Sequence, residues 1–197
     1  MRRRSGRGWR EALAITVATV AALALGGCSG EGDGDDPSGG SGTGGEHAVE
    51  TDATLGKVRG GLDEAQAEEV LAAVTEVIDG WIDGGYGGDY PRADFASAFG
   101  AFTGDARELA LARAAVMSNA DLGAGLERAE VTRRSVSVDV LAADGRPAGA
   151  TAHVVVTVEL AGDVERTDQI SGRLLLTPGK QGWRVFGFDV SRGEEGA

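Results

Sequence analysis

Cysteine is nearly absent from this sequence, and its scarcity removes several kinds of chemistry. Cys28 is the only cysteine among 197 residues, so no disulfide can cross-link the chain, and histidine occurs only twice. The sequence also lacks the G-x-S-x-G, H-E-x-x-H and P-loop patterns of common hydrolases and nucleotide-binding enzymes. Hydrolytic and metal-dependent chemistry therefore has few residues to work with, and we expect neither a cofactor nor a bound metal.

The sequence also lacks a hydrophobic run long enough to cross a membrane. The longest run, residues 12–25, is shorter than the roughly 20 residues that a spanning helix needs. Arginines crowd the first ten residues ahead of it. A basic start followed by a short apolar stretch is typical of a cleaved signal peptide, which takes no part in the folded domain. We expect residues 1–27 to be that signal peptide.

The apolar run ends in Leu25-Gly26-Gly27-Cys28, with small residues before the cysteine and a flexible polar stretch after it. This arrangement resembles the lipobox of bacterial lipoproteins, in which the cysteine becomes the first residue and carries acyl chains such as palmitate. The resemblance implies lipid attachment at Cys28 and a location on the extracytoplasmic face of the cell membrane. The alternative is a free cysteine behind an ordinary secretory peptide. If Cys28 is lipidated, no thiol remains for a zinc site or a nucleophile.

Acidic residues outnumber basic ones throughout the chain. The formal net charge is −12, and loss of residues 1–27 would take it to −16, because that segment carries five positive charges and one negative charge. Such a surface repels phosphate backbones, so we expect no nucleic-acid partner. The partners that remain are the membrane, through the lipid anchor, and an unknown protein or small apolar ligand.

Composition divides the chain into a linker and one domain. Residues 29–52 contain eight glycines and no lysine or arginine, and such a segment cannot bury enough apolar surface to offset the entropy lost on ordering. Residues 40–45 match G-x-G-x-x-G, but the strand and helix that a dinucleotide site requires are missing around them. We expect a disordered linker over residues 28–54, a folded domain over 55–193 and a disordered tail over 194–197.

The first half of the domain has helical periodicity. Asp63 and Gln66 form a capping-box pattern, and apolar residues from Val70 to Ile82 then recur on one face up to Gly84-Gly85. The sequence predicts a second helix from Pro91 with Phe95, Phe99 and Phe102 on one face. It predicts a third helix from the capping-box pattern of Asp105 and Glu108 to about Asn119.

The second half of the domain alternates between apolar and polar residues, as strands do. Val136, Val138 and Val140 mark the first strand, the even-numbered residues 150–160 the second, Ile170, Leu174 and Leu176 the third, and residues 183–190 the fourth. Turn residues at 144–147 and 178–182 favour an antiparallel meander. The sequence predicts an α+β fold in which three N-terminal helices pack on one face of a curved, four-stranded antiparallel sheet.

This order of elements, with its closing segment GWRVFGFDV at residues 182–190, resembles the nuclear transport factor two-like superfamily of cystatin-like α+β cones. The chain is also similar to exported actinobacterial lipoproteins with a G-D-Y-P-R-x-D-F stretch, which lies here at residues 88–95. The resemblance implies a cone-like domain with a pocket at its open end. The superfamily includes ketosteroid isomerases, polyketide cyclases, dehydratases and non-catalytic binding domains, so the fold alone decides little about function.

Few residues qualify for a site. Enzymes of this superfamily commonly pair a carboxylate with a histidine or tyrosine in the cone, and His153 could be such a base or a structural surface histidine. Tyr86 and Tyr90 flank a glycine-rich loop, where they could line a pocket mouth or pack their rings with the hydroxyls in water. Arg133-Arg134 fits solvated surface charge. No family catalytic motif aligns with any position, so we assign no catalytic residue.

The sequence therefore predicts a lipid-anchored, non-catalytic domain that binds a protein or a small apolar ligand outside the cytoplasmic membrane. One alternative is a small-molecule enzyme of the isomerase, cyclase or dehydratase type that uses the cone pocket. Another is an accessory subunit of an envelope transport or secretion complex. A cavity enclosing His153 and a carboxylate would favour the enzyme, whereas an interior filled by Phe and Trp side chains would favour the binding domain.

Overall fold

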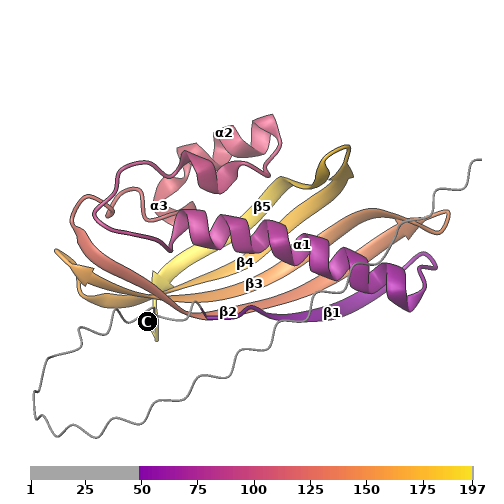
Figure 1. Ribbon diagram of the computed structural model, residues 1–197, viewed down its shortest axis with the longest axis horizontal. Coiled ribbons are helices and arrows are strands. Elements are labelled where there is room, and N and C mark those ends of the chain that lie inside the picture. The colour runs from indigo at the N-terminus through magenta and orange to yellow at the C-terminus, as the bar shows by residue number, and fades with distance from the viewer. Residues whose placement is uncertain (1–48, 197) are drawn as a thin grey trace, which may run out of the picture. The chain divides into compact units, whose positions relative to one another are not determined.

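A long helix lying across a five-stranded sheet makes up most of the described structure (Figure 1). The computed structural model describes residues 49–196; the predicted signal peptide, Cys28 and most of the predicted linker lie outside this range. In chain order the elements are β1 (Asp52–Arg59), α1 (Glu64–Gly85), the 3-10 helix η1 (Ala96–Phe99), α2 (Gly104–Ala112), α3 (Ala114–Met117), β2 (Leu126–Ala143), β3 (Arg146–Gly162), β4 (Arg166–Gly179) and β5 (Gly182–Glu194).

Helix α1 begins and ends as the sequence predicts. The Asp63 carboxylate accepts a hydrogen bond from the Gln66 backbone N–H at 2.8 Å, and the Gln66 side chain accepts one from the Asp63 N–H at 3.2 Å. This capping box supplies partners for two backbone donors that a helix start leaves unpaired. The predicted apolar stripe faces the sheet, where its central members Val74, Ile78 and Trp81 are buried.

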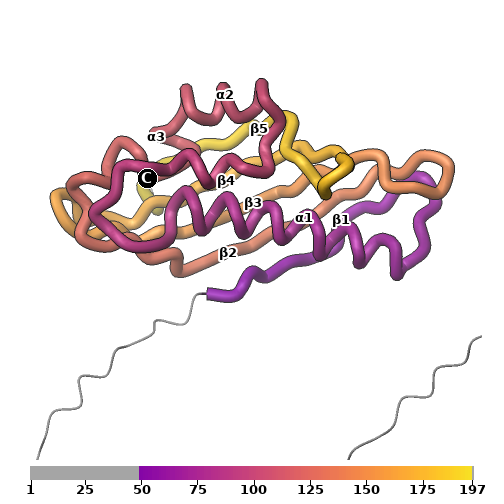
Figure 2. The backbone as a smooth tube through the Cα atoms, turned by 45° about the horizontal axis from the view of Figure 1, so that its top comes forward, coloured from indigo at the N-terminus to yellow at the C-terminus, as the bar shows by residue number. Residues whose placement is uncertain are grey.

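The sheet is mostly antiparallel, and its strands follow one another in the order β1-β2-β3-β4-β5. Strands β2 to β5 form the predicted antiparallel meander. Strand β1 lies at the edge and pairs with β2 in parallel. The helices lie on one face of the sheet, and the other face is left uncovered by any helix of the described residues (Figures 1 and 2). The predicted α+β class, with helices on one face, is confirmed.

The prediction of four strands is wrong because it omits β1. Residues 52–54 were expected to belong to the linker, yet the strand begins at Asp52, and the Thr51 hydroxyl donates a hydrogen bond to Asp79 of α1 at 2.5 Å. In β1 only Ala53 and Leu55, which precede the bulge, are partly buried. The sequence of β1 therefore shows little of the apolar–polar alternation that identifies a strand. At the other end β5 continues through Glu194, which the sequence assigns to the tail.

The second and third predicted helices also differ from the structure. No α-helix begins at Pro91. A four-residue 3-10 helix contains Phe99, and the three phenylalanines of the predicted aromatic face are buried in the core from this turn and the loops beside it. The third helix begins after Thr103 rather than at Asp105, and it breaks at Arg113 into α2 and α3. The break directs Met117 into the core and brings the residues after it against the end of the sheet.

Aromatic side chains fill the space between α1 and the sheet. The Trp81 and Tyr86 rings meet edge to face with centroids 5.6 Å apart, and Phe99 and Phe102 do the same at 5.3 Å. All four are almost completely buried. The even-numbered residues of β3 from 150 to 160 face this core, as the alternation predicts. The interior of the domain between α1 and the sheet is therefore packed with aromatic side chains.

Candidate functional site

Three β-bulges gather at one end of the sheet, where the β2–β3 and β4–β5 hairpins turn. One extra residue in β1 lies between Leu55 and Val58, another is Ala148 in β3, and a third is Phe186 in β5. A bulge leaves its extra residue out of the ladder and turns the side chain in a new direction. Bulges are over-represented at sheet edges and next to active sites, so this end of the sheet is a candidate site.

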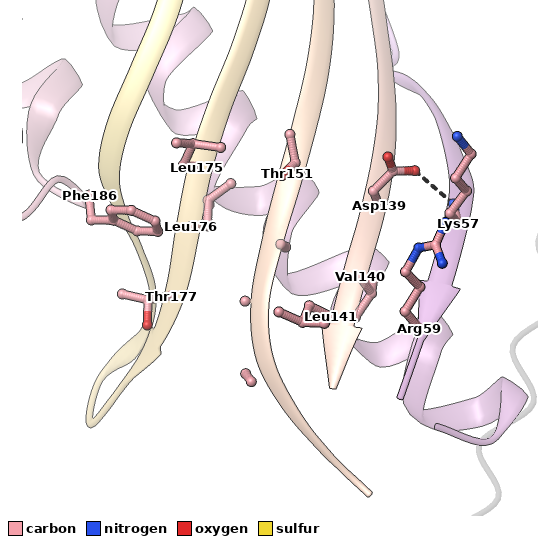
Figure 3. Close-up of a pocket in the computed structure, with 13 residues that line it drawn as sticks. Lys57, Arg59, Asp139, Val140, Leu141, Thr151, Leu175, Leu176, Thr177 and Phe186 are labelled. Carbon is pink, nitrogen blue, oxygen red and sulfur yellow. Dashed lines mark hydrogen bonds between the residues drawn. The ribbon is translucent and has the colours of Figure 1, made fainter. Parts of the chain in front are cut away.

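The bulged residues line a groove on the uncovered face of the sheet (Figure 3). The groove has a volume of about 410 Å³, within the roughly 300–1,000 Å³ of small-molecule sites. Its walls are mainly apolar, and Leu141 and Phe186 are 56% and 51% exposed. Gly149 and Ala148 of β3 also line it, between Leu141 on β2 and Leu175 on β4. Because these two residues have little or no side chain, the face is hollow there.

Charged residues lie only at the β1 side of the groove. The Asp139 carboxylate accepts a hydrogen bond from the Lys57 backbone N–H at 2.7 Å and lies 3.5 Å from His153 Nε2. The Lys57 N–H bond, followed by the bond to His153, holds the pKa of Asp139 below its usual value. A Cβ atom at Gly56 would lie 2.3 Å from the Asp139 carboxylate, so glycine there lets the carboxylate approach the bulge.

Arg59 is, with Lys57, one of the two cations that line this site. Figure 3 shows the Arg59 side chain directed back along β1 toward Lys57. Within residues 49–196 Arg59 forms no ion pair and no side-chain hydrogen bond, whereas five other arginines of that part of the chain do form ion pairs: Arg128, Arg134, Arg166, Arg173 and Arg192. An unpaired guanidinium beside an apolar groove is available to a ligand.

The rest of the uncovered face is polar and already paired. Next to the groove, His153, Arg173 and Asp189 are register neighbours on β3, β4 and β5, and Arg173 forms an ion pair with Asp189 at 3.3 Å. The following row contains Ser171 and Ser191. Exposed apolar surface on this face is therefore concentrated at the bulged end.

A second polar cluster lies at the opposite end of the sheet, and it is buried. Arg192 of β5 donates to the Asp168 carboxylate at 2.7 Å, to the Ser118 carbonyl at 2.9 Å and to the Asn119 side-chain carbonyl at 2.8 Å. Arg166 donates to the other oxygen of Asp168 at 2.7 Å. The Asp168 and Arg192 side chains are only 2% and 7% exposed. Since every member is paired, this network joins β4 and β5 to the segment after α3 and serves the fold.

The predicted site residues occupy three different environments. Tyr86 is fully buried, and its hydroxyl donates to the Val116 carbonyl at 2.5 Å, so it neither lines a pocket mouth nor leaves its hydroxyl in water. Burial raises the pKa of this hydroxyl far above its usual value, which removes it from acid–base chemistry. The Tyr90 hydroxyl donates to the Tyr86 carbonyl at 3.0 Å and accepts from Asn119 at 2.8 Å. Tyr90 does line a pocket, of about 470 Å³, together with Asp83 and Arg134.

His153 lies on the uncovered face with its side chain 50% exposed, so it is outside the core and beside the groove rather than in it. Arg134 departs from the expectation of solvated charge. It is 8% exposed, faces α1 and bonds to Asp83 at 2.5 Å. None of the site candidates chosen from the sequence therefore lines the groove. A signal existed only in the glycines Gly56 and Gly149, which interrupt strands and mark close approach or bulges.

The described residues contain no cluster of three or more histidine, cysteine or acidic residues that could hold a metal ion. None of the helices between residues 49 and 196 combines the length and apolar character needed to span a membrane. No family model matches the sequence, and no curated protein or solved structure matches it.

Proposed function

We propose that this protein is a non-catalytic binding domain, held by a lipid anchor at Cys28 on the extracytoplasmic face of the cell membrane, and that its ligand occupies the groove at the bulged end of the sheet. The convergence of three bulges on one apolar groove carries the binding part of this proposal. The lipobox pattern of residues 25–28 supports the anchoring part.

The packed interior argues against the alternative of an isomerase, cyclase or dehydratase. We assign the domain to the cone-like nuclear transport factor two-like superfamily, whose enzymes place a carboxylate and a histidine or tyrosine inside the cone. Here the corresponding space holds Trp81, Phe99 and Phe102, and His153 is outside it. Tyr86 is inside, but its hydroxyl is bonded to a backbone carbonyl. A domain with a filled interior and an apolar groove on its outer face is better suited to binding than to catalysis.

Replacing Cys28 by alanine should abolish membrane attachment. Alanine has no thiol to carry the thioether, and a single cysteine means that no other residue can replace it. Fractionation should find the variant released from the membrane or retained as an uncleaved precursor, and mass spectrometry of the unchanged protein should find added acyl mass on Cys28. A mature N-terminus elsewhere, without acyl mass, would contradict the anchor.

Filling the groove should weaken binding of a neutral apolar probe such as Nile red. The variant Gly149→Leu places a side chain in the hollow, and it should be accommodated because the nearest atom to a Cβ at this position is the Leu176 carbonyl oxygen at 3.5 Å, an ordinary contact. We expect fluorescence titration to show saturable binding to the unchanged domain and at least about tenfold weaker binding to the variant, a loss of roughly 1.4 kcal/mol.

The matched control is Gly193→Leu on β5, at the far end of the sheet, where a Cβ meets no atom within 4 Å. This variant should bind the probe as the unchanged domain does. Both variants should keep the cooperative melt, which circular dichroism can check. Probe binding that is equal in all three proteins, or absent from all three, would reject the groove as a binding site.

A further inference from the structure

We infer that the ligand of the groove is an amphiphile with an anionic head group, whose apolar chain lies across the strands from Leu141 toward Phe186 and whose head group meets Arg59 and Lys57. This inference rests on the proposed binding function and adds the chemistry of the ligand. It follows from how charge, apolar surface and length are distributed around the groove.

Charge defines one end of the ligand. The chain is strongly acidic, with a formal net charge of −12, yet two of the three charged residues that line the groove are the cations Lys57 and Arg59. The third, Asp139, uses one carboxylate oxygen on the Lys57 backbone N–H and has the other near His153. Exposed charges farther away than about 8 Å are largely screened at physiological salt, so the two nearby cations decide the sign of the local field.

Apolar surface defines the other end. Beyond Asp139 the groove passes Leu141, Leu175 and Phe186, and the charged residues it touches all lie at or beside β1. At about 4.8 Å per strand, the distance from β1 to β5 is roughly 19 Å, which suits an extended acyl chain better than a compact ring. The ligand that matches both ends is a long-chain carboxylate or a similar single-chain anionic amphiphile.

The limited apolar area favours a small molecule over a protein. A stable protein interface buries about 800 Å² on each partner. On the uncovered face only Leu141 and Phe186 are large, strongly exposed apolar residues, and the rows beyond them carry the Arg173–Asp189 ion pair and serines. The apolar lining of the groove is a narrow band that includes Leu141, Leu175 and Phe186, as expected for a site that takes one chain.

The test compares a fluorescent long-chain carboxylate, cis-parinaric acid, with its methyl ester. The protein is the chain from position 28 onward with Cys28→Ser, which contains the whole compact unit Gly45–Ala197 and carries no acyl group of its own. At about pH 8 the carboxylate in water is ionised. We expect the acid to bind about fivefold more tightly than the ester, and the difference to shrink as salt is raised, because partly exposed ion pairs contribute modestly and are screened.

The double variant Lys57→Gln/Arg59→Gln should bind the acid no more tightly than the ester, because the charges that meet the head group are removed. The control Arg107→Gln/Arg113→Gln removes the same charge from exposed positions in and at the end of α2, away from the groove, and it should keep the preference. The Gly149→Leu variant should weaken binding of both probes, which shows that they occupy the groove.

The outcomes separate this inference from the proposed function. If the ester binds in the groove and the acid binds no more tightly, the head group is wrong and the binding function stands. If neither probe binds while an apolar acidic peptide does, the ligand is a protein segment and the inference is overturned. A dimer whose formation is abolished by Phe186→Ser, together with no probe binding, would assign the groove to a second copy of the chain. Absence of any binding would reject inference and function together.

Discussion

Replacing Asp168 by alanine should destabilise the domain by about 3–5 kcal/mol, since removing one member of a buried ion pair leaves the other charge without compensation. Arg192 would keep its bonds to the Ser118 and Asn119 carbonyls but would lose the only carboxylate it contacts, at a site where its side chain is 7% exposed. In thermal denaturation the melting temperature should fall by about 6–20 °C, because each kcal/mol shifts the midpoint of a domain this size by roughly 2–4 °C.

A double-mutant cycle separates the ion pair from ordinary packing. The variant Arg192→Met removes the stranded charge, so Asp168→Ala/Arg192→Met should be less destabilised than the sum of the two single changes. Arg166→Ala is the control, because its side chain is 38% exposed and also contacts Asp168. That change should cost about 1 kcal/mol or less. Additive single and double changes would mean that Asp168 and Arg192 are not coupled.

This network also shows what a sequence cannot predict. Asp168 and Arg192 are 24 positions apart, and they meet because β4 and β5 pair in a register that places Asp168 opposite Glu194 and Ile170 opposite Arg192. Nothing in the local sequence around either residue indicates the partner. The burial of Arg134 and its ion pair with Asp83 could not be predicted from the local sequence either. Arg134 follows a bulge in β2, and the shift in register turns its side chain toward α1 and Asp83.

Sequence patterns were sufficient to predict those helices and strands that have a capping motif or a regular apolar periodicity. Helix α1 has a capping box and an apolar stripe, and β2 to β4 alternate regularly, so their existence and their buried faces follow from periodicity alone. Strand β1 lacked such a signal, since an edge strand buries few side chains. The phenylalanines at 95, 99 and 102 fit a helical spacing, but a 3-10 turn and flanking loops bury them equally well.

The groove was unpredictable for a related reason. Its floor and walls come from all five strands, and its shape depends on bulges, each of which is a property of two paired strands rather than of one segment. The residues that the sequence favoured, Tyr86, Tyr90 and His153, were chosen for their chemistry. The groove is instead lined by Leu141, Phe186 and Gly149, and residues of these types do not indicate a functional site in a sequence.

The second large loss of stability is expected from disturbing the packing of α1 on the sheet. Val74 is completely buried at the centre of the helix, against the inward face of the sheet. Val74→Asp would place a carboxylate there without a partner, at a cost of several kcal/mol, against a total stability of about 5–15 kcal/mol for a domain. We expect the cooperative thermal transition to be lost or to fall by more than 10 °C, as measured by circular dichroism.

Ala72→Asp is the matched control for this change. It introduces the same side chain two positions away, on the exposed side of α1. Its effect should be limited to the lower helix propensity of aspartate, about 0.7 kcal/mol, and a few tenths of a kcal/mol from repulsion by Glu68 and Glu76, four positions away on either side. If both variants melted alike, burial of the Val74 side chain would not be what holds α1 to the sheet. A large difference between them would locate that stability in the apolar stripe, because charge, residue type and helix are the same in both.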